Sequence, residues 1–133
     1  MSYCEVRDYK GLKIVYTDIA GTSGGEAIPT FDKVQGLVAK FPDKSVLSCV
    51  NATDARFNKE LLAKIKETVK RNNPKAKATV VCGLSKLSTL ILNGIITATG
   101  RQMKLFDKVE DGLEWLAKYE SEHATPSPVS SSL

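Results

Sequence analysis

The fold of this protein is decided by one stretch of its sequence, Lys44-Ser-Val-Leu-Ser-Cys-Val-Asn-Ala-Thr-Asp-Ala-Arg-Phe57. Residues 46–50 are apolar apart from Ser48, and this short run lies between two segments that have helical periodicity. Such a run predicts a strand that is buried on both faces of a sheet. The chain then turns polar over residues 51–56, which predicts a loop at the carboxyl end of that strand.

The segments around this strand predict the other elements. Residues 3–8 and 12–19 have the composition of strands and predict an antiparallel hairpin, with Gly11 in its turn. We expect helices over residues 27–41, 59–72, 86–98 and from 109 onward, and further strands over residues 77–83 and 102–106. The predicted order is a hairpin followed by αβαβαβα. This is an α/β fold with a mostly parallel sheet flanked by helices and its first strand at an antiparallel edge.

Local signals predict where two of these helices begin and end. Asn58 and Ser85 stand immediately before the second and third helical segments, where their side chains would cap the free backbone N–H groups. Asn72-Asn73-Pro74 ends the second helix, and Gly100 ends the third.

The length of 133 residues indicates one domain. We assign residues 1–120 to that domain and residues 121–133, which show no periodicity, to a disordered tail. No stretch approaches the roughly 20 apolar residues of a membrane span, and Met1–Lys10 lacks the apolar core of a signal peptide. We therefore expect a cytoplasmic protein.

The formal charge of +4 is unevenly distributed along the chain. Residues 58–104 carry ten basic and two acidic side chains, an excess that can attract phosphate, nucleic acid or an anionic surface. The basic face of the second helix has no interleaved aromatic residues on which bases could stack. We therefore predict a solvated helix face and no nucleic-acid partner.

The residue types that carry catalysis are scarce. The single histidine, His123, falls in the predicted tail, which removes Ser-His and Cys-His catalysis and histidine-based metal sites from the domain. Cys4, Cys49 and Cys82 are an odd number without CxxC spacing, and we interpret them as buried, reduced thiols. We predict a protein that is not an enzyme and that has no cofactor and no metal.

The first candidate site is the polar loop after the central strand, because functional groups gather beyond the carboxyl ends of strands in open α/β sheets. It contains Thr53, Asp54, Arg56 and Asn58. Arg56 can bind a carboxylate or phosphate through two hydrogen bonds, and the following helix N-terminus adds positive potential. The alternative is structural: Asp54 or Asn58 caps the helix, and Arg56 pairs with a neighbouring carboxylate.

The second candidate site is the third helix, whose apolar residues spread around more than one face. A surface helix needs one apolar stripe, so the surplus must be buried elsewhere. Three interpretations remain open: a homodimer or partner interface, an internal apolar pocket beneath the helix, or a helix wedged deep in its own core. The predicted binding residues are Leu87, Ile91, Leu92 and Ile96.

Two parts of the chain carry a resemblance to a known family. One combines Lys44-Ser-Val-Leu-Ser-Cys-Val50 with Asp54-Ala-Arg-Phe57, and the other combines Thr99-Gly-Arg-Gln-Met-Lys-Leu-Phe-Asp107 with Val109-Glu-Asp-Gly-Leu-Glu-Trp-Leu116. With these residues the chain resembles the SpoIIAA-like group of STAS domains, also described as STAS/SEC14, from about residue 12 to residue 119.

The resemblance implies an α/β sandwich that regulates other proteins by binding them, or that binds a small apolar or anionic ligand. In the anti-sigma-factor antagonists of this group, a serine at the start of the second long helix is phosphorylated and switches partner binding. Here Asp54–Glu60 contains no serine, and Thr53 lies before the helix.

We therefore predict a non-catalytic regulatory or protein-binding module, with a protein partner or a second copy of itself, that lacks the phosphoacceptor serine. The alternative is a small-molecule or lipid carrier with an apolar pocket under the Leu87–Ile96 helix, which the SEC14 side of the resemblance suggests. Peripheral membrane contact is the least favoured alternative.

Overall fold

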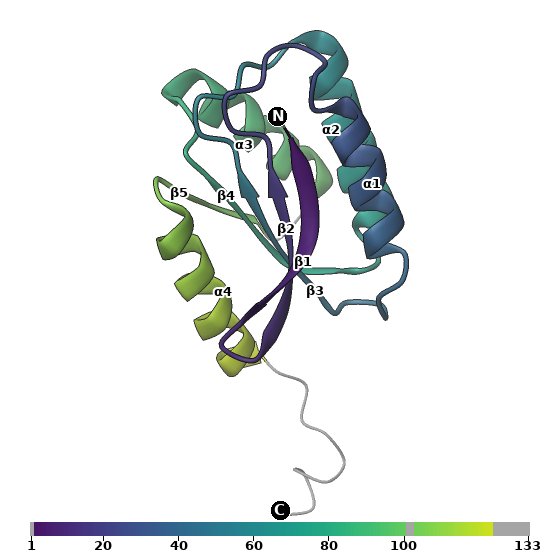
Figure 1. Cartoon of the computed structure of the whole chain (residues 1–133), viewed down its shortest axis with the longest axis vertical. Coiled ribbons are helices and arrows are strands. Elements are labelled where there is room, and N and C mark those ends of the chain that lie inside the picture. The colour runs from purple at the N-terminus through teal and green to yellow at the C-terminus, as the bar shows by residue number, and fades with distance from the viewer. Residues whose placement is uncertain (1, 101–102, 124–133) are drawn as a thin grey trace, which may run out of the picture.

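The computed structural model describes residues 2–100 and 103–123 of the chain. Its elements are β1 (Tyr3–Tyr9), β2 (Leu12–Asp18), α1 (Ile28–Val38), β3 (Val46–Asn51), α2 (Lys59–Asn72), β4 (Ala76–Cys82), α3 (Lys86–Thr99), β5 (Met103–Phe106) and α4 (Val109–His123) (Figure 1). The predicted order of a hairpin followed by αβαβαβα is confirmed.

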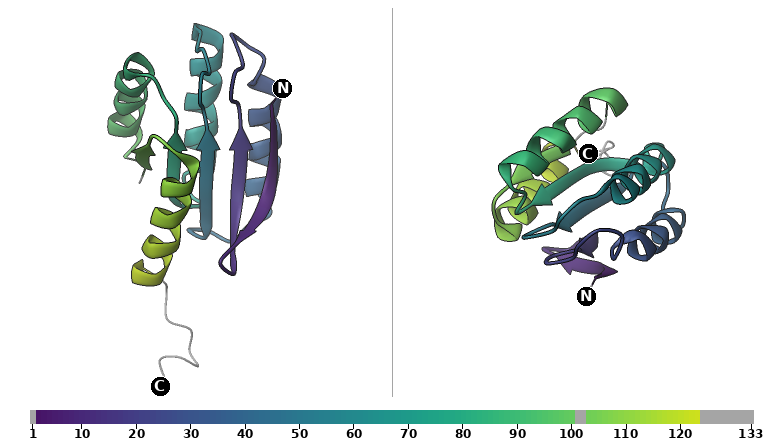
Figure 2. Two further views of the ribbon diagram at one scale, coloured as in Figure 1. Left: turned by 60° about the vertical axis from the view of Figure 1, so that its left-hand side comes forward. Right: turned by 90° about the horizontal axis from the view of Figure 1, so that it is seen from above.

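The five strands form one sheet in the order β1-β2-β3-β4-β5. β1 is antiparallel to β2 at one edge, and the remaining pairs are parallel, which confirms the predicted α/β class. Each right-handed crossover moves one strand further in the same direction, so α1, α2 and α3 must fall on the same face. α4 follows the last strand and covers the opposite face (Figure 2).

The face under α4 is closely packed. Leu116 of α4 is fully buried among strand residues such as Ile14 and Cys49. A Cβ atom on Gly112 would lie 2.8 Å from the Cys82 Sγ and 3.0 Å from the Val80 Cγ2. The absence of a side chain at this position therefore lets α4 approach the sheet.

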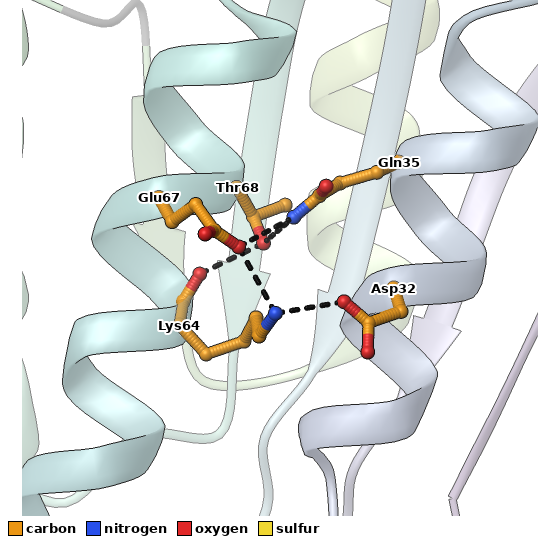
Figure 3. A network of polar contacts seen from close by, with 5 residues as sticks. All are labelled: Asp32, Gln35, Lys64, Glu67 and Thr68. Carbon is orange, nitrogen blue, oxygen red and sulfur yellow. Dashed lines mark hydrogen bonds and ion pairs between the residues drawn. The ribbon is translucent and has the colours of Figure 1, made fainter.

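On the opposite face, a polar network joins α1 to α2 (Figure 3). The Lys64 Nζ lies 2.7 Å from the Asp32 Oδ1 and 3.0 Å from the Glu67 Oε2. The Gln35 Nε2 donates to the Thr68 Oγ1 over 2.9 Å. These contacts hold the two helices together, beside the apolar residues that face the sheet.

The end of α4 differs from the prediction. The helix continues through His123, whose ring stacks on Tyr119 one turn earlier with 4.0 Å between ring centroids. Residues 121–123 are thus helical, and the prediction that placed His123 in a tail is wrong. This aromatic contact lies beyond the apolar stripe of the helix. Sequence periodicity detects only the stripe, so it places the end of the helix too early. The rest of the predicted tail, residues 124–133, lies outside the described residues.

Within residues 2–100 and 103–123, no helix combines the length and the apolar character that crossing a membrane requires.

Candidate functional site

The loops that follow β2, β3 and β4 are joined at the carboxyl edge of the sheet. The Gly21 N–H donates to the Thr53 carbonyl over 2.9 Å, and the Arg56 N–H donates to the Thr22 carbonyl over 2.8 Å. Gly83, after β4, packs so closely on Thr53 that an added Cβ would lie 2.2 Å from its Oγ1. Backbone contacts therefore fix the polar loop of the first candidate site against both neighbouring loops.

Within this loop the capping role belongs to Asn58. Its Oδ1 accepts a hydrogen bond from the Leu61 N–H over 2.8 Å, as predicted for the residue before α2. Asp54 instead stands in the left-handed region at φ 58°, which an aspartate tolerates better than most residues. The Thr53 hydroxyl donates to the Asn51 Oδ1 over 2.7 Å. The helix start is thus capped by an amide and carries no hydroxyl group.

Arg56 carries the positive charge of this loop. Its side chain is exposed, and it makes no hydrogen bond or ion pair with any residue that the structure describes. The alternative that Arg56 pairs with a neighbouring carboxylate is therefore not seen in this part of the chain. An exposed guanidinium beside the start of α2 can bind an external carboxylate or phosphate.

α3 divides its apolar residues between two environments. Leu92 and Ile95 are buried against the core under α2, with exposed fractions of 4% and 3%. Leu87 and Leu90 lie on the opposite side of the helix and are 69% and 71% exposed. Ile91 is half-buried between the two sides.

The predicted site residues on α3 are therefore not all on one surface. Leu92 faces the core, and the half-buried Ile96 packs against the same core, so the wedge interpretation holds for this side of the helix. Leu87 remains free to contact a partner. Leu90 was not predicted as a site residue. The signal was present in the sequence, because Leu90 follows Leu87 by three residues and so lies on the same helix face.

A cavity of about 80 Å³ lies between the sheet and the helices α1 and α2; we call it the inter-layer cavity. Phe31 of α1, Ile65 of α2 and Val81 of β4 are among its walls. Leu92 belongs to its lining, whereas the other three predicted residues of α3 do not. The cavity is thus centred further from α3 than the predicted pocket.

The inter-layer cavity has polar groups in its wall. The Ser48 Oγ and the Thr79 Oγ1 lie 2.8 Å apart in a hydrogen bond, and the Thr68 hydroxyl donates to the Lys64 carbonyl. Thr17 and Asn72 are 1% and 7% exposed, and neither side chain makes a hydrogen bond within the described chain. A buried polar group without a partner costs about 1–3 kcal/mol, so these two are the unusual features of the cavity.

The cysteines lie apart from both candidate sites. All three are free thiols, and Cys49 and Cys82 are fully buried under α4, as predicted, whereas Cys4 is only half-buried on the edge strand. A hydrogen bond with the Cys82 thiol, together with burial, raises the pKa of the Cys49 thiol. A protonated, enclosed thiol is a poor nucleophile.

No protein-family model matches the sequence, and no curated protein matches it. Solved structures do match. An uncharacterized protein from the DUF3478 family with a SpoIIAA-like fold, from Shewanella loihica PV-4, is 12% identical, with a TM-score of 0.71 over 86% of this chain and 93% of that one.

Two further matches are STAS proteins. An anti-sigma-factor antagonist (STAS) domain protein from Planctomyces limnophilus is 9% identical, with a TM-score of 0.61 over 86% of this chain and 97% of its own. An anti-sigma factor antagonist from Mycobacterium paratuberculosis is 15% identical, with a TM-score of 0.54 over 88% of this chain and 95% of its own.

At sequence identities this low, the structural similarity establishes the fold and leaves the activity open. The matches nevertheless span 86–88% of this chain and 93–97% of the matched chains, with TM-scores from 0.54 to 0.71. The resemblance read from the sequence is confirmed at the level of the fold: this chain has the SpoIIAA-like fold of STAS-domain proteins.

Proposed function

We propose that this protein is a non-catalytic regulatory module that binds a protein partner at the carboxyl edge of its sheet. The observation that carries the proposal is the exposure of Leu87 and Leu90, 69% and 71%, one turn apart on α3. Large apolar side chains that are adjacent and exposed are typical of contact surfaces. Two of the structural neighbours are named as antagonists of anti-sigma factors, which are proteins.

The chemistry of this edge defines the partner. Leu87 and Leu90 fit an apolar groove, and the exposed guanidinium of Arg56 fits an anionic group, which on a protein surface is a carboxylate. We propose a protein surface that offers both. Because Asp54–Glu60 contains no hydroxyl side chain, this binding would not be switched by phosphorylation at the start of α2.

Site-specific photo-crosslinking tests this proposal. A photo-reactive amino acid is placed at position 90 and, as a control, at position 6, because Val6 is also exposed but lies on the edge strand β1. We expect position 90 to capture a protein that position 6 does not. The captured protein is then purified, and its affinity is measured for the wild type, Leu90→Ser and Val6→Ser.

A reduction of about tenfold or more for Leu90→Ser, with no change for Val6→Ser, would support the proposal. If the captured protein is a second copy of this chain, sedimentation of Leu90→Ser should show the monomer. Equal affinity of both variants, or no capture above the control, would overturn the proposal.

A second candidate function is the binding of a small molecule, and the inter-layer cavity favours it. The volume of about 80 Å³ is smaller than the roughly 150 Å³ that holds benzene in an engineered cavity. This space therefore supports a small ligand and not the carriage of a lipid chain.

A further inference from the structure

The inter-layer cavity has a polar floor built from three adjacent strands. Ser48 of β3 is paired directly with Thr79 of β4, and Thr17 of β2 is paired with Val50, two residues along the same face from Ser48. All four of these residues line the cavity. Its floor therefore carries three hydroxyl groups, from Ser48, Thr79 and Thr17, in a space whose other walls are mostly apolar.

Two polar side chains of this lining have no partner in the described chain. The Thr17 hydroxyl is on the floor, and the Asn72 carboxamide enters from the end of α2; they are 1% and 7% exposed. A carboxamide offers two N–H donors and an acceptor oxygen, and a hydroxyl offers a donor and an acceptor. Buried polar groups are nearly always hydrogen-bonded, so this pair indicates a missing partner with complementary groups.

The lining also restricts the charge of that partner. None of the described residues around the cavity is Asp, Glu, Lys or Arg. An ion placed there would lose its hydration without gaining an opposite charge, which is strongly unfavourable. The occupant must therefore be neutral, and the apolar walls formed by residues such as Phe31 and Ile65 require an apolar body.

The size of the cavity limits the occupant further. Its volume of about 80 Å³ exceeds the roughly 10–15 Å³ that one water molecule needs and is about half of the cavity that binds benzene. A short aliphatic body with one polar group suits this space better than a single water or a ring with substituents.

We propose that the inter-layer cavity binds a small neutral alcohol or primary amide, whose polar group bonds to Asn72 and Thr17 and whose apolar body lies between α1 and α2. This site is separate from the exposed side of α3 that carries Leu87 and Leu90, and it does not depend on partner binding. It gives a ligand class to the second candidate function.

Nuclear magnetic resonance on the full chain tests the proposal with defined probes. The protein is unfolded and refolded in ligand-free buffer, and is then titrated separately with 1-butanol, butyramide and butyrate, which have similar bodies and different polar groups. We expect saturable shifts of the Asn72 side-chain amide and of the Val50 and Val81 backbone amides with 1-butanol and butyramide. Butyrate, which is charged, should cause none.

Two variants place the binding in the cavity. Thr17→Val and Asn72→Leu each remove one unpartnered polar group, and either should weaken 1-butanol binding about fivefold, the loss expected for one neutral hydrogen bond. Thr22→Val is the matched control, because Thr22 is equally buried but is not part of the cavity wall. It should leave the affinity unchanged. If Asn72→Leu does not fold, Thr17→Val still decides the test.

The proposal would be overturned if neither neutral probe causes saturable shifts, since the cavity would then be closed space or hold only water. It would also be overturned if butyrate binds as well as 1-butanol, or if Thr17→Val and Thr22→Val retain equal affinity. None of these outcomes depends on Leu90, so failure of this proposal and failure of the partner-binding proposal can be told apart.

Discussion

The two faces of the sheet are packed in different ways. Under α4, one helix lies so close to β4 that Gly112 has no room for a Cβ atom, and the polar Tyr16 hydroxyl is bonded to the Asp18 Oδ2. Under α1 and α2, the same sheet leaves a cavity of about 80 Å³ and two buried polar groups that have no partner among the described residues. Close packing and satisfied polar groups stabilise a fold, whereas vacant space gives room for a ligand. We infer that the α4 face mainly holds the sheet together and that the other face retains room for binding.

The largest expected difference between the faces comes from truncating one leucine on each. Leu116→Ala should destabilise the protein by about 3–5 kcal/mol, because this side chain is fully enclosed and its neighbours cannot collapse into the space. Leu92→Ala should cost about 2–3 kcal/mol, because Leu92 already borders the cavity and loses fewer contacts. Chemical denaturation of both variants measures the two costs. Equal costs would contradict the contrast in packing.

The enclosed tyrosine of the α4 face provides a pH-dependent test. Burial, together with the hydrogen bond to Asp18, raises the pKa of Tyr16 to about 12. The ordinary pKa of tyrosine in an unfolded chain is about 10. Because the folded value is the higher one, the stabilisation is fully present below pH 10 and is lost as the pH rises from about 10 toward 12. The total loss is at most about 2–3 kcal/mol.

Absorbance of the ionised tyrosine follows this titration in the native protein. The hydrogen bond with Glu114 also raises the pKa of Tyr9, so Tyr16 is not the only delayed tyrosine. We expect the phase near pH 12 to come from Tyr16 and to be missing from Tyr16→Phe. If Tyr16→Phe leaves the titration curve unchanged, the Tyr16 hydroxyl is not held as the structure shows.

Alanine substitutions at two helical glycines, one on α4 and one on α3, test how closely each helix is packed. Gly112→Ala should cost about 1–3 kcal/mol, because the new Cβ would lie 2.8 Å from the Cys82 Sγ and the gain in helix propensity does not offset this clash. Gly94→Ala on α3 meets nothing within 4 Å and should stabilise the protein by up to about 1 kcal/mol. Thermal unfolding of the two variants should therefore shift in opposite directions. A stabilising Gly112→Ala would show that α4 can move away from the sheet at little cost.

Local signals explain why much of the fold could be predicted. The second helix begins after Asn58 and ends at Asn72 as expected, because a capping side chain and a following proline act within one turn. The third is likewise capped by Ser85 and closed by Gly100 in the left-handed conformation. Their common face follows from the handedness of successive crossovers. The end of α4 was missed, because a ring contact between Tyr119 and His123 replaces the apolar stripe there.

The candidate sites depend on tertiary packing and were less predictable. The sequence shows that α3 has more apolar residues than one face needs, but it does not show which of them face the core. Leu92 and Ile96 turned inward, while Leu90 stayed exposed beside Leu87. The cavity leaves no pattern at all, because it is a space that neighbouring side chains fail to fill. Asn72 gives only the signal of a helix end, so the burial of its carboxamide without a partner among residues 2–100 and 103–123 could not be anticipated.

The smallest expected change in the free energy of unfolding also tests most directly whether the sheet face under α1 and α2 holds a buried polar group without a partner among the described residues. Thr17 and Thr22 are both 1% exposed, but the Thr22 hydroxyl donates to the Ile19 carbonyl over 2.7 Å, whereas the Thr17 hydroxyl has no partner among the described residues. Valine has nearly the same shape as threonine, so Thr→Val changes little except the polar group. Thr22→Val should cost about 0.5–1.5 kcal/mol, because it removes this hydrogen bond while the Ile19 carbonyl still accepts from the Thr22 N–H. Thr17→Val should be neutral or stabilising by up to about 1 kcal/mol, because it removes a buried group that bonds to nothing. Both are measured by denaturant unfolding of protein refolded in ligand-free buffer. An equal loss in the two variants would mean that water inside the cavity already satisfies Thr17, and the two faces would then differ in packing but not in the satisfaction of their polar groups.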